Sequence, residues 1–93
     1  MVQSILVVDD NRELQKLVRS ALEHEGYDVL TAGDAVQGLE LIARGKIDVA
    51  LVDVMMPGMD GLTMLSHLRE HNDNLRVIIM TALNTSETAV SAL

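Results

Sequence analysis

The sequence predicts an α/β fold, a doubly wound parallel sheet with helices on both faces. Two observations predict it: short apolar runs alternate with longer segments whose apolar residues recur at helical spacing, and the connections between them are short. Alternation of this kind joins parallel strands through right-handed crossovers. The chain has 93 residues with no linker, repeat or low-complexity segment, so we expect one domain spanning residues 1–93.

The first strand and the first helix come before Gly26. Ile5–Val8 is a continuous apolar run followed by two acids, which is typical of a strand covered on both faces. Asp10 or Asn11 could cap the helix that follows, and Gly26 ends it. The residues expected to face the core on this helix are Leu14, Leu17, Val18, Ala21 and Leu22.

A second strand and helix and a third strand follow. The second strand is predicted at Asp28–Ala32, and Asp34 is placed to cap a helix that Gly45 ends. The inward residues of this helix are expected to be Ala35, Leu39, Ile42 and Ala43. Asp48–Asp53 is apolar in its middle and acidic at its end, which indicates the third strand.

The remaining elements follow a turn. Pro57–Gly61 predicts that turn, and the next helix is expected to present Leu62, Leu65 and Leu68 to the core. Leu75–Thr81 is predicted as the fourth strand. Thr85 or Ser86 could cap a last helix. Its apolar residues are Ala89, Val90 and Leu93.

Composition and charge exclude several classes of function. Fourteen acidic residues against seven basic ones give a net charge of −7, so we expect no direct binding to nucleic acid or to anionic membranes. The chain contains no cysteine, which excludes disulfides, thiolate metal ligands and thiol nucleophiles. The apolar runs are too short to span a bilayer and the first residues lack a secretory signal, so we expect a cytoplasmic protein.

Three acidic residues stand at the ends of predicted strands. Asp9 and Asp10 follow the first strand, and Asp53 ends the third. Open parallel sheets bind ligands at the carboxyl ends of their strands, where the strand order reverses. If the first and third strands are neighbours, the three carboxylates converge on one pocket. A helix cap would explain Asp10, but it explains Asp53 poorly, because a turn and not a helix start follows Asp53.

Such a cluster predicts a bound cation. Close carboxylates repel one another by about 4 kcal/mol per pair near the protein surface. They persist by protonation or by binding a cation, and a hard divalent ion such as Mg²⁺ suits oxygen ligands best. The ion would neutralise an incoming phosphoryl group and leave one carboxylate free to attack phosphorus. The hydroxyl of Thr81 and the backbone N–H of Ala82 would then be donors to the phosphoryl oxygens.

Three motifs together resemble the receiver domain of two-component response regulators. They are Val7-Val8-Asp9-Asp10, then Asp53 followed by Met56-Pro57-x-Met59-Asp60-Gly61, and then Thr81-Ala82. The resemblance runs over the whole chain, and the motifs are specific in combination. It implies a flavodoxin-like fold with the strand order 2-1-3-4-5. It also implies that Asp53 accepts a phosphoryl group from a histidine kinase or a phosphotransfer protein, and that Thr81 is the switch residue.

The same resemblance implies a ligand set for Mg²⁺. Asp10 and Asp53 would bind the ion directly, Asp9 would act largely through water, and the backbone carbonyl of Met55 would be a further ligand. A glycine at position 61 is expected to allow either a positive φ or close packing before the third helix.

The length of the sequence adds an expectation of its own. Receiver domains carry a fifth strand with a lysine that contacts the phosphoryl group, whereas this sequence ends at Leu93, so we expect a truncated receiver domain with four of its five βα units. Lys16 lies in the first helix and Lys46 at the opposite end of the sheet, so neither replaces that lysine. The fourth strand would be an uncovered apolar edge, and we expect either a dimer or higher assembly through it or a marginally stable fragment.

Three functions follow, of which the leading one is a phosphorylatable signalling module and not a turnover enzyme. One alternative is a Mg²⁺-dependent phosphatase with an aspartyl nucleophile. That class usually carries D-x-D after the first strand, whereas Asp9 and Asp10 are adjacent and Asp53 lies on the third strand. The other alternative is a phosphorylation-impaired fragment or scaffold that self-associates through the edge of the fourth strand.

Overall fold

The computed structural model describes residues 2–54, 56, 58–70 and 75–80. Four strands alternate with three helices in this part of the chain: β1 (Ser4–Val8), α1 (Arg12–His24), β2 (Asp28–Ala32), α2 (Ala35–Ala43), β3 (Val49–Asp53), α3 (Gly61–Glu70) and β4 (Arg76–Met80). Each of them falls within a residue or two of a predicted element. The helix expected after the fourth strand lies outside the described residues.

All described strands run parallel in one sheet with the order β2-β1-β3-β4, which confirms the predicted fold class. The chain moves from β1 to β2 on one side and then crosses back to place β3 on the other side of β1. The strand order therefore reverses between β1 and β3, where sheets of this kind bind their ligands.

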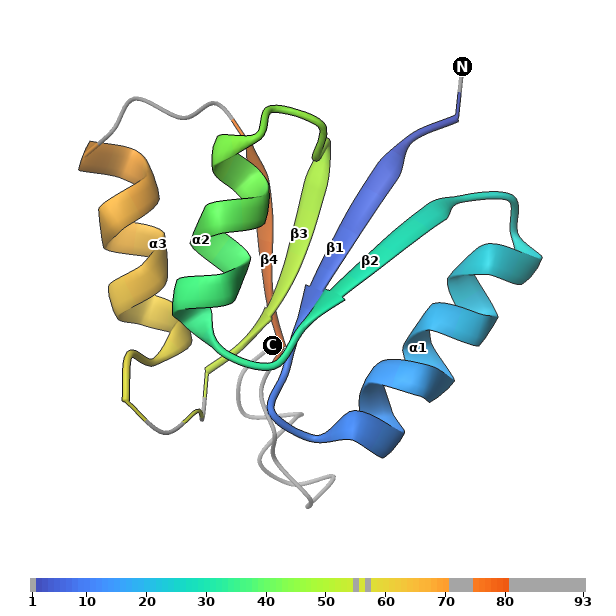
Figure 1. Cartoon of the computed structure of the whole chain (residues 1–93), viewed down its shortest axis with the longest axis horizontal. Helices are drawn as coiled ribbons and strands as arrows, with labels where there is room; N and C mark the ends of the chain where they lie inside the picture. Colours follow the sequence, from blue (N-terminus) through green and yellow to red (C-terminus); the bar gives the residue numbers. More distant parts are fainter. Residues whose placement is uncertain (1, 55, 57, 71–74, 81–93) are drawn as a thin grey trace, which may run out of the picture.

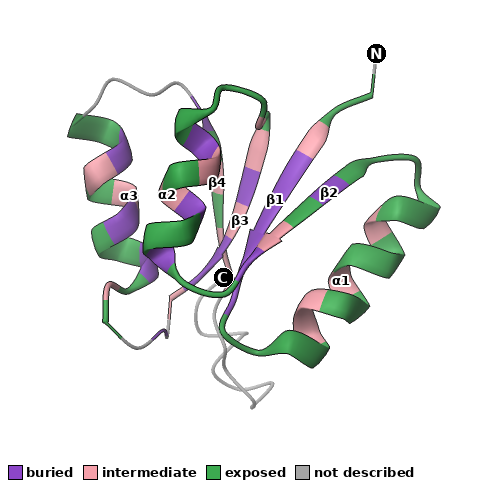
Figure 2. Ribbon diagram, viewed as in Figure 1, coloured by how far each residue is buried: buried purple, intermediate pink, exposed green. Residues whose placement is uncertain are grey.

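The helices cover the sheet on both sides (Figure 1), with α1 on one face and α2 and α3 on the other. Figure 2 shows buried segments in the sheet and in α2 and α3. The α2/α3 face holds the larger core, which consists of Leu6, Val8, Ala32, Ala35, Ile42, Ala50, Val52, Met56, Met64, Leu68 and Leu75. The α1 face holds a smaller core of Ile5, Val7 and Val29. The four residues from Ile5 to Val8 are buried, because β1 lies between two strands and under helices on both sides.

Two predicted core positions were wrong. Leu17 is 69% exposed, because α1 faces the sheet with the neighbouring stripe of Leu14, Val18 and Leu22. Leu62 is 55% exposed, and α3 instead buries Gly61, Met64 and Leu68. Successive residues of a helix are rotated by about 100° about its axis. A position next to the buried stripe therefore points away from the core, even when its residue is apolar.

Two smaller predictions of buried alanines were also wrong. Ala21 on α1 and Ala43 on α2 are exposed, because both lie beside the stripe that faces the sheet and not within it. On α2 the structure buries Ala35, Gly38 and Ile42 and leaves Leu39 half-buried.

The helix limits follow the predicted capping residues. Asp34 caps α2 by accepting a hydrogen bond from the Gln37 N–H at 2.7 Å. For α1 the sequence left two candidates open, and the cap is Asn11, whose Oδ1 accepts from the N–H groups of Glu13 at 3.0 Å and Leu14 at 3.2 Å. None of the helices in the described part of the chain is long and apolar enough to cross a membrane.

Candidate metal centre

The pairing of β1 with β3 brings two of the predicted acidic residues side by side. Val8 pairs with Val52 in the parallel register, so Asp9 and Asp53, one residue further along each strand, reach the carboxyl edge of the sheet together. Asp9 is held there by its own N–H, which donates to the carbonyl of Ala32 at 3.0 Å. Both side chains are buried, with 2% of Asp9 and 3% of Asp53 exposed.

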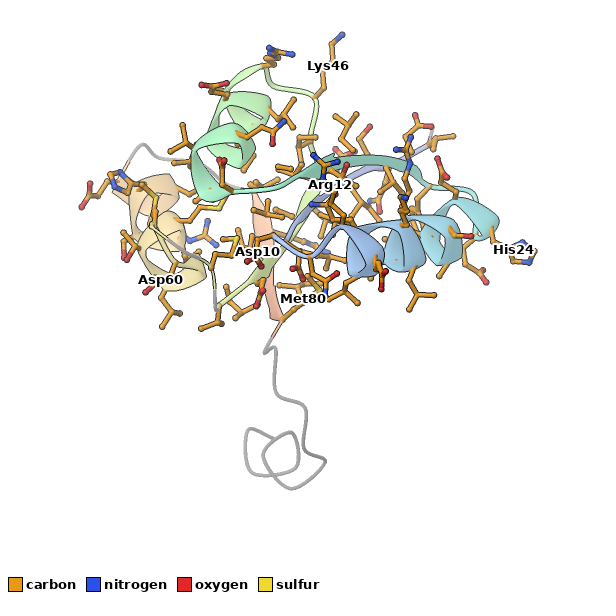
Figure 3. All side chains as sticks on the ribbon, turned by 60° about the horizontal axis from the view of Figure 1, so that its bottom comes forward. Asp10, Arg12, His24, Lys46, Asp60 and Met80 are labelled. Atoms are coloured by element: carbon orange, nitrogen blue, oxygen red, sulfur yellow. The ribbon has the colours of Figure 1, made fainter. Side chains whose placement is uncertain are left out.

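Asp10 completes the cluster from the exposed side. One carboxylate oxygen from each of Asp9, Asp10 and Asp53 lies within 4.8 Å of the other two. Because Asn11 caps α1, the carboxylate of Asp10 has no helix N–H groups to satisfy and remains with the cluster. Figure 3 shows Asp10 and Met80 near one another at this edge, while Lys46 lies at the far side of the molecule.

The cluster is electrostatically unfavourable for Asp9. Burial raises the pKa of this carboxyl above its ordinary value of 3.8, and the charges of Asp53 and Asp10 raise it further. The hydrogen bond that the Asn11 N–H donates to Asp9 Oδ1 at 2.9 Å acts in the opposite direction and favours the charged form. When ionised, Asp9 therefore carries a charge that water solvates poorly and that a cation would stabilise.

The backbone around Asp9 is held by a residue that sequence reasoning missed. Gln15, one turn into α1, donates from Nε2 to the backbone carbonyl of Asp9 and, at 3.2 Å, to that of Ala32. A single side chain therefore ties the ends of β1 and β2 to the helix that follows the acidic pair. The contact with Ala32 joins residues 17 positions apart, and no local pattern in the sequence signals it.

The loop after Asp53 is held to both neighbouring elements. The Val54 N–H donates to the carbonyl of Met80 at 3.1 Å, and the Gly61 N–H donates to the carbonyl of Val54 at 3.3 Å. Gly61 packs against the backbone of Asp53, whereas the positive φ in this loop belongs to Gly58, at 78°. Of the two reasons expected for a glycine at position 61, the structure shows close packing.

Asp60 starts the helix that follows this loop. Its Oδ1 accepts from the Thr63 N–H at 2.8 Å, and its carbonyl accepts from the Met64 N–H at 3.0 Å. The hydrogen bonds from Thr63 lower the pKa of the Asp60 carboxyl. Asp60 is therefore a helix cap, and it places Gly61 at the first position of α3.

The remaining predicted site residues lie outside the described residues: Met55, Thr81 and Ala82. β4 ends at Met80, which pairs with Asp53 in the register of the sheet. The fourth strand is thus described up to the level of the acidic cluster.

The donor set fits a hard divalent cation. Three carboxylates within reach of one ion supply only oxygen atoms, which Mg²⁺ and Ca²⁺ prefer over nitrogen or sulfur. Two of them are buried and one is exposed, so an ion held here would keep an open side toward the solvent. The arrangement can hold a cation beside the carboxylate of Asp53 and present both to an incoming anionic group.

Comparisons with known proteins agree with this geometry. The family model for the response regulator receiver domain matches residues 5–93. Response regulator MprA of Mycobacterium leprae is 39% identical over 89 residues, which cover 96% of this chain and 39% of that protein. The probable transcriptional regulatory protein TcrX of Mycobacterium tuberculosis is 39% identical over 90 residues, covering 97% of this chain and 38% of that protein. The chain thus spans about two fifths of the length of these curated relatives.

Solved structures share the fold. The receiver domain of a Francisella response regulator matches with a TM-score of 0.83 and 35% identity, over 96% of this chain and 74% of that one. Response regulator TrrA of Thermotoga maritima, solved in complex with Mg²⁺-BeF, matches with a TM-score of 0.84 and 30% identity, over 98% of this chain and 79% of that one. Since the family model covers nearly the whole chain and the strand order agrees with the fold, the chain belongs to the response regulator receiver domain family.

Proposed function

We propose that this chain accepts a phosphoryl group on Asp53 from a histidine kinase or a phosphotransfer protein, and that phosphorylation switches a partner or output surface. The observation that carries the proposal is the meeting of three carboxylate oxygens within 4.8 Å at the point where the strand order reverses. A structural role for such a cluster is disfavoured, because it buries two acids and raises the pKa of one of them.

Mg²⁺ is the proposed cofactor. Asp10 and Asp53 would bind it directly, Asp9 largely through water, and the backbone carbonyl of Met55 would be a further ligand. The relative TrrA, which shares this fold, was crystallised in complex with Mg²⁺-BeF, and that complex supports the assignment. When bound, the ion supplies neutralisation of the charge that collects on the phosphoryl oxygens.

The chemical step is a phosphoryl transfer between side chains. A carboxylate oxygen of Asp53 attacks the phosphorus of a phosphohistidine, and a new O–P bond forms. The N–P bond breaks, its electron pair stays on the imidazole nitrogen, and Asp53 becomes an acyl phosphate. Burial of Asp53 at the edge of the sheet keeps its carboxylate poorly solvated, and therefore easier to bring into contact with phosphorus.

Thr81 and Ala82 are the proposed partners of the transferred group. The hydroxyl of Thr81 and the N–H of Ala82 would donate to phosphoryl oxygens, and Thr81 would act as the switch residue. Support comes from the register of the sheet, in which β4 ends at Met80 opposite Asp53, immediately before Thr81 in the sequence.

A small-molecule phosphodonor tests the proposal without a kinase. We expect incubation of the chain with the donor and Mg²⁺ to give a base-labile phosphoryl adduct that intact-mass measurement detects. The adduct should be absent from Asp53→Asn and from samples treated with a chelator. Asp28→Asn, at the exposed start of β2, is the matched control and should be phosphorylated normally. An adduct that persists in Asp53→Asn contradicts the assignment, and sustained release of phosphate from esters would favour the phosphatase alternative.

A second candidate function is a scaffold that self-associates through β4. The observation that favours it is Ile78, which is 53% exposed although it lies in the middle of a strand of the sheet. Sedimentation of the chain at high concentration tests it, with a dimer expected and a stable monomer as the contradicting result. A cytoplasmic location and the lack of direct nucleic acid or membrane partners remain predictions from composition.

A further inference from the structure

A pocket separate from the acidic cluster lies along α1. This open pocket of about 360 Å³ is formed where α1, the end of β2 and the start of α2 meet. Its lining combines cations with neutral polar groups: Arg12, Gln15, Lys16, Arg19, Thr31, Gly33 and Gln37. Three of the seven basic residues of this acidic chain therefore line a single pocket, and no acidic residue does.

The cations of this pocket are largely without acidic partners. Arg19 is the exception, since its Nε forms an ion pair with Glu23 Oε2 at 3.4 Å, and both side chains are about half exposed. Arg12 and Lys16 have no carboxylate at ion-pair distance among the described residues. An exposed pair of this kind contributes little, so Arg19 can also turn toward a ligand.

The neutral groups divide into those already used and those available. Gln15 donates to the carbonyls of Asp9 and Ala32, so its Nε2 is committed to the backbone. Gln37 accepts with Oε1 from the Gly33 N–H at 2.9 Å, which fixes the amide and leaves its Nε2 as a donor. Together with the hydroxyl of Thr31, the pocket therefore offers donors and positive charge.

We propose that this pocket binds the polyphosphate group of a small soluble molecule, such as a nucleoside triphosphate or an inorganic polyphosphate. Arg12, Lys16 and Arg19 stand at i, i+4 and i+7 on one face of α1. Seven residues of helix extend about 10 Å, which exceeds a single phosphate group and matches a chain of several. The net charge of −7 opposes any anion at long range, but salt screens it beyond about 8 Å, so the cations of the pocket dominate at contact.

The pocket has no aromatic ring on which a base could stack. Tyr27 is the single aromatic residue of the chain, and it precedes β2, whereas the pocket lies at the other end of that strand. Without an aromatic ring to stack on, a nucleoside adds little binding energy. Tripolyphosphate and ATP are therefore expected to bind alike, and inorganic phosphate more weakly.

Titration in the presence of a chelator tests the site, because the chelator removes any divalent ion that could attract phosphate to the acidic cluster. Tripolyphosphate, ATP and inorganic phosphate are titrated into the chain and followed by calorimetry and by amide NMR. We expect saturable binding of the first two with similar dissociation constants, and shifts at Thr31, Gly33 and Gln37. The double variant Arg12→Gln/Lys16→Gln should bind about tenfold more weakly or worse, since it removes two charged donors.

The matched control is Arg44→Gln/Lys46→Gln, which also removes one arginine and one lysine. Both residues follow α2, and Figure 3 shows Lys46 well away from Arg12 of the pocket. Its affinity should be unchanged, and both double variants should fold, because all four side chains are exposed. The proposal is overturned by non-saturable binding, by equal losses in the two double variants, or by ATP binding far more tightly than tripolyphosphate. None of these results depends on phosphorylation of Asp53.

Discussion

A methyl group placed on Gly61 would lie 2.5 Å from the backbone oxygen of Asp53 and 3.0 Å from its carbonyl carbon. The first residue of α3 therefore rests directly on the main chain that carries the proposed phosphoacceptor. The carbonyl of Val54 accepts from the Gly61 N–H in the same place. The end of β3 is thus held between β1 on one side and the start of α3 on the other, and only a residue without a side chain fits there.

Gly61→Ala tests this contact. Because backbone cannot rotate away as a side chain can, the added methyl group should displace Asp53 or α3, at a loss of about 1–3 kcal/mol in the free energy of unfolding. Mg²⁺ affinity should fall as well, since one carboxylate leaves its position. Chemical denaturation and a Mg²⁺ titration measure both effects.

Gly33→Ala is the control for that variant. A methyl group on Gly33 would meet only Gln15 Nε2 and Gln37 Oε1, both at an ordinary contact distance of 3.9 Å. Stability and Mg²⁺ affinity should therefore stay close to those of the parent chain. An equal loss in the two variants would show that the contact with Asp53 is not the cause.

Asp9→Asn should stabilise the metal-free chain at neutral pH. The folded state raises the pKa of Asp9, mainly through burial, so it binds this proton more tightly than the unfolded state does. The contribution of Asp9 to stability therefore falls as the pH rises from the ordinary carboxyl pKa through the raised one, and it stays low above that window. Asparagine keeps the acceptor for the Asn11 N–H but carries no charge.

The measurement for Asp9 is the free energy of unfolding with a chelator present, followed from acid to neutral pH. We expect the gain of Asp9→Asn over the parent to grow as the pH rises, whereas Asp28→Asn, exposed at the start of β2, should show no such gain. A gain that shrinks toward neutral pH would mean that the site favours the charged form of Asp9.

Mg²⁺ should stabilise the folded chain through the acidic cluster. Binding to the folded state alone raises the free energy of unfolding by about 2.7 kcal/mol at a free concentration one hundred times the dissociation constant. Thermal denaturation across a Mg²⁺ series measures the effect. Asp10→Asn should abolish this stabilisation, because it removes one carboxylate of the cluster. The variant should still fold, since Asp10 neither caps α1 nor is buried. A full Mg²⁺ response in that variant would remove Asp10 from the ligand set.

Asn11→Ala should weaken α1. It removes the side-chain acceptor for two N–H groups of α1, which costs about 1 kcal/mol. A loss of that size lowers the melting temperature by about 4–8 °C in a domain of this length. Asn11→Ser keeps a capping oxygen and should recover most of the loss in a thermal scan. Equal melting temperatures for the two variants would contradict the capping role.

Much of this fold could be predicted from the sequence, because strands covered on both faces and glycine-ended helices leave strong local patterns. The run from Ile5 to Val8 and the acids after it located the central strand and the candidate site together. Asp53 could also be predicted as a site residue, because it ends a strand and no helix starts directly after it.

The features that the sequence did not predict depend on contacts between residues that are far apart in the sequence. Leu17 and Leu62 have the hydrophobicity of core residues, but the side that a helix turns to the sheet is set by close approaches such as that of Gly61 to Asp53. The choice of Asn11 over Asp10 as the cap was likewise open, because both residue types cap helices well. The hydrogen bonds of Gln15 could not be foreseen until the ends of β1 and β2 were placed side by side.

Localising the phosphoryl group tests the central claim most directly. The chain is phosphorylated with a small-molecule donor and Mg²⁺, the acyl phosphate is reduced with borohydride, and the modified residue is identified by tandem mass spectrometry of its peptides. We predict modification at Asp53 and at neither of the other two members of the cluster, Asp9 and Asp10. Modification of Asp9 or Asp10 in place of Asp53 would contradict the account.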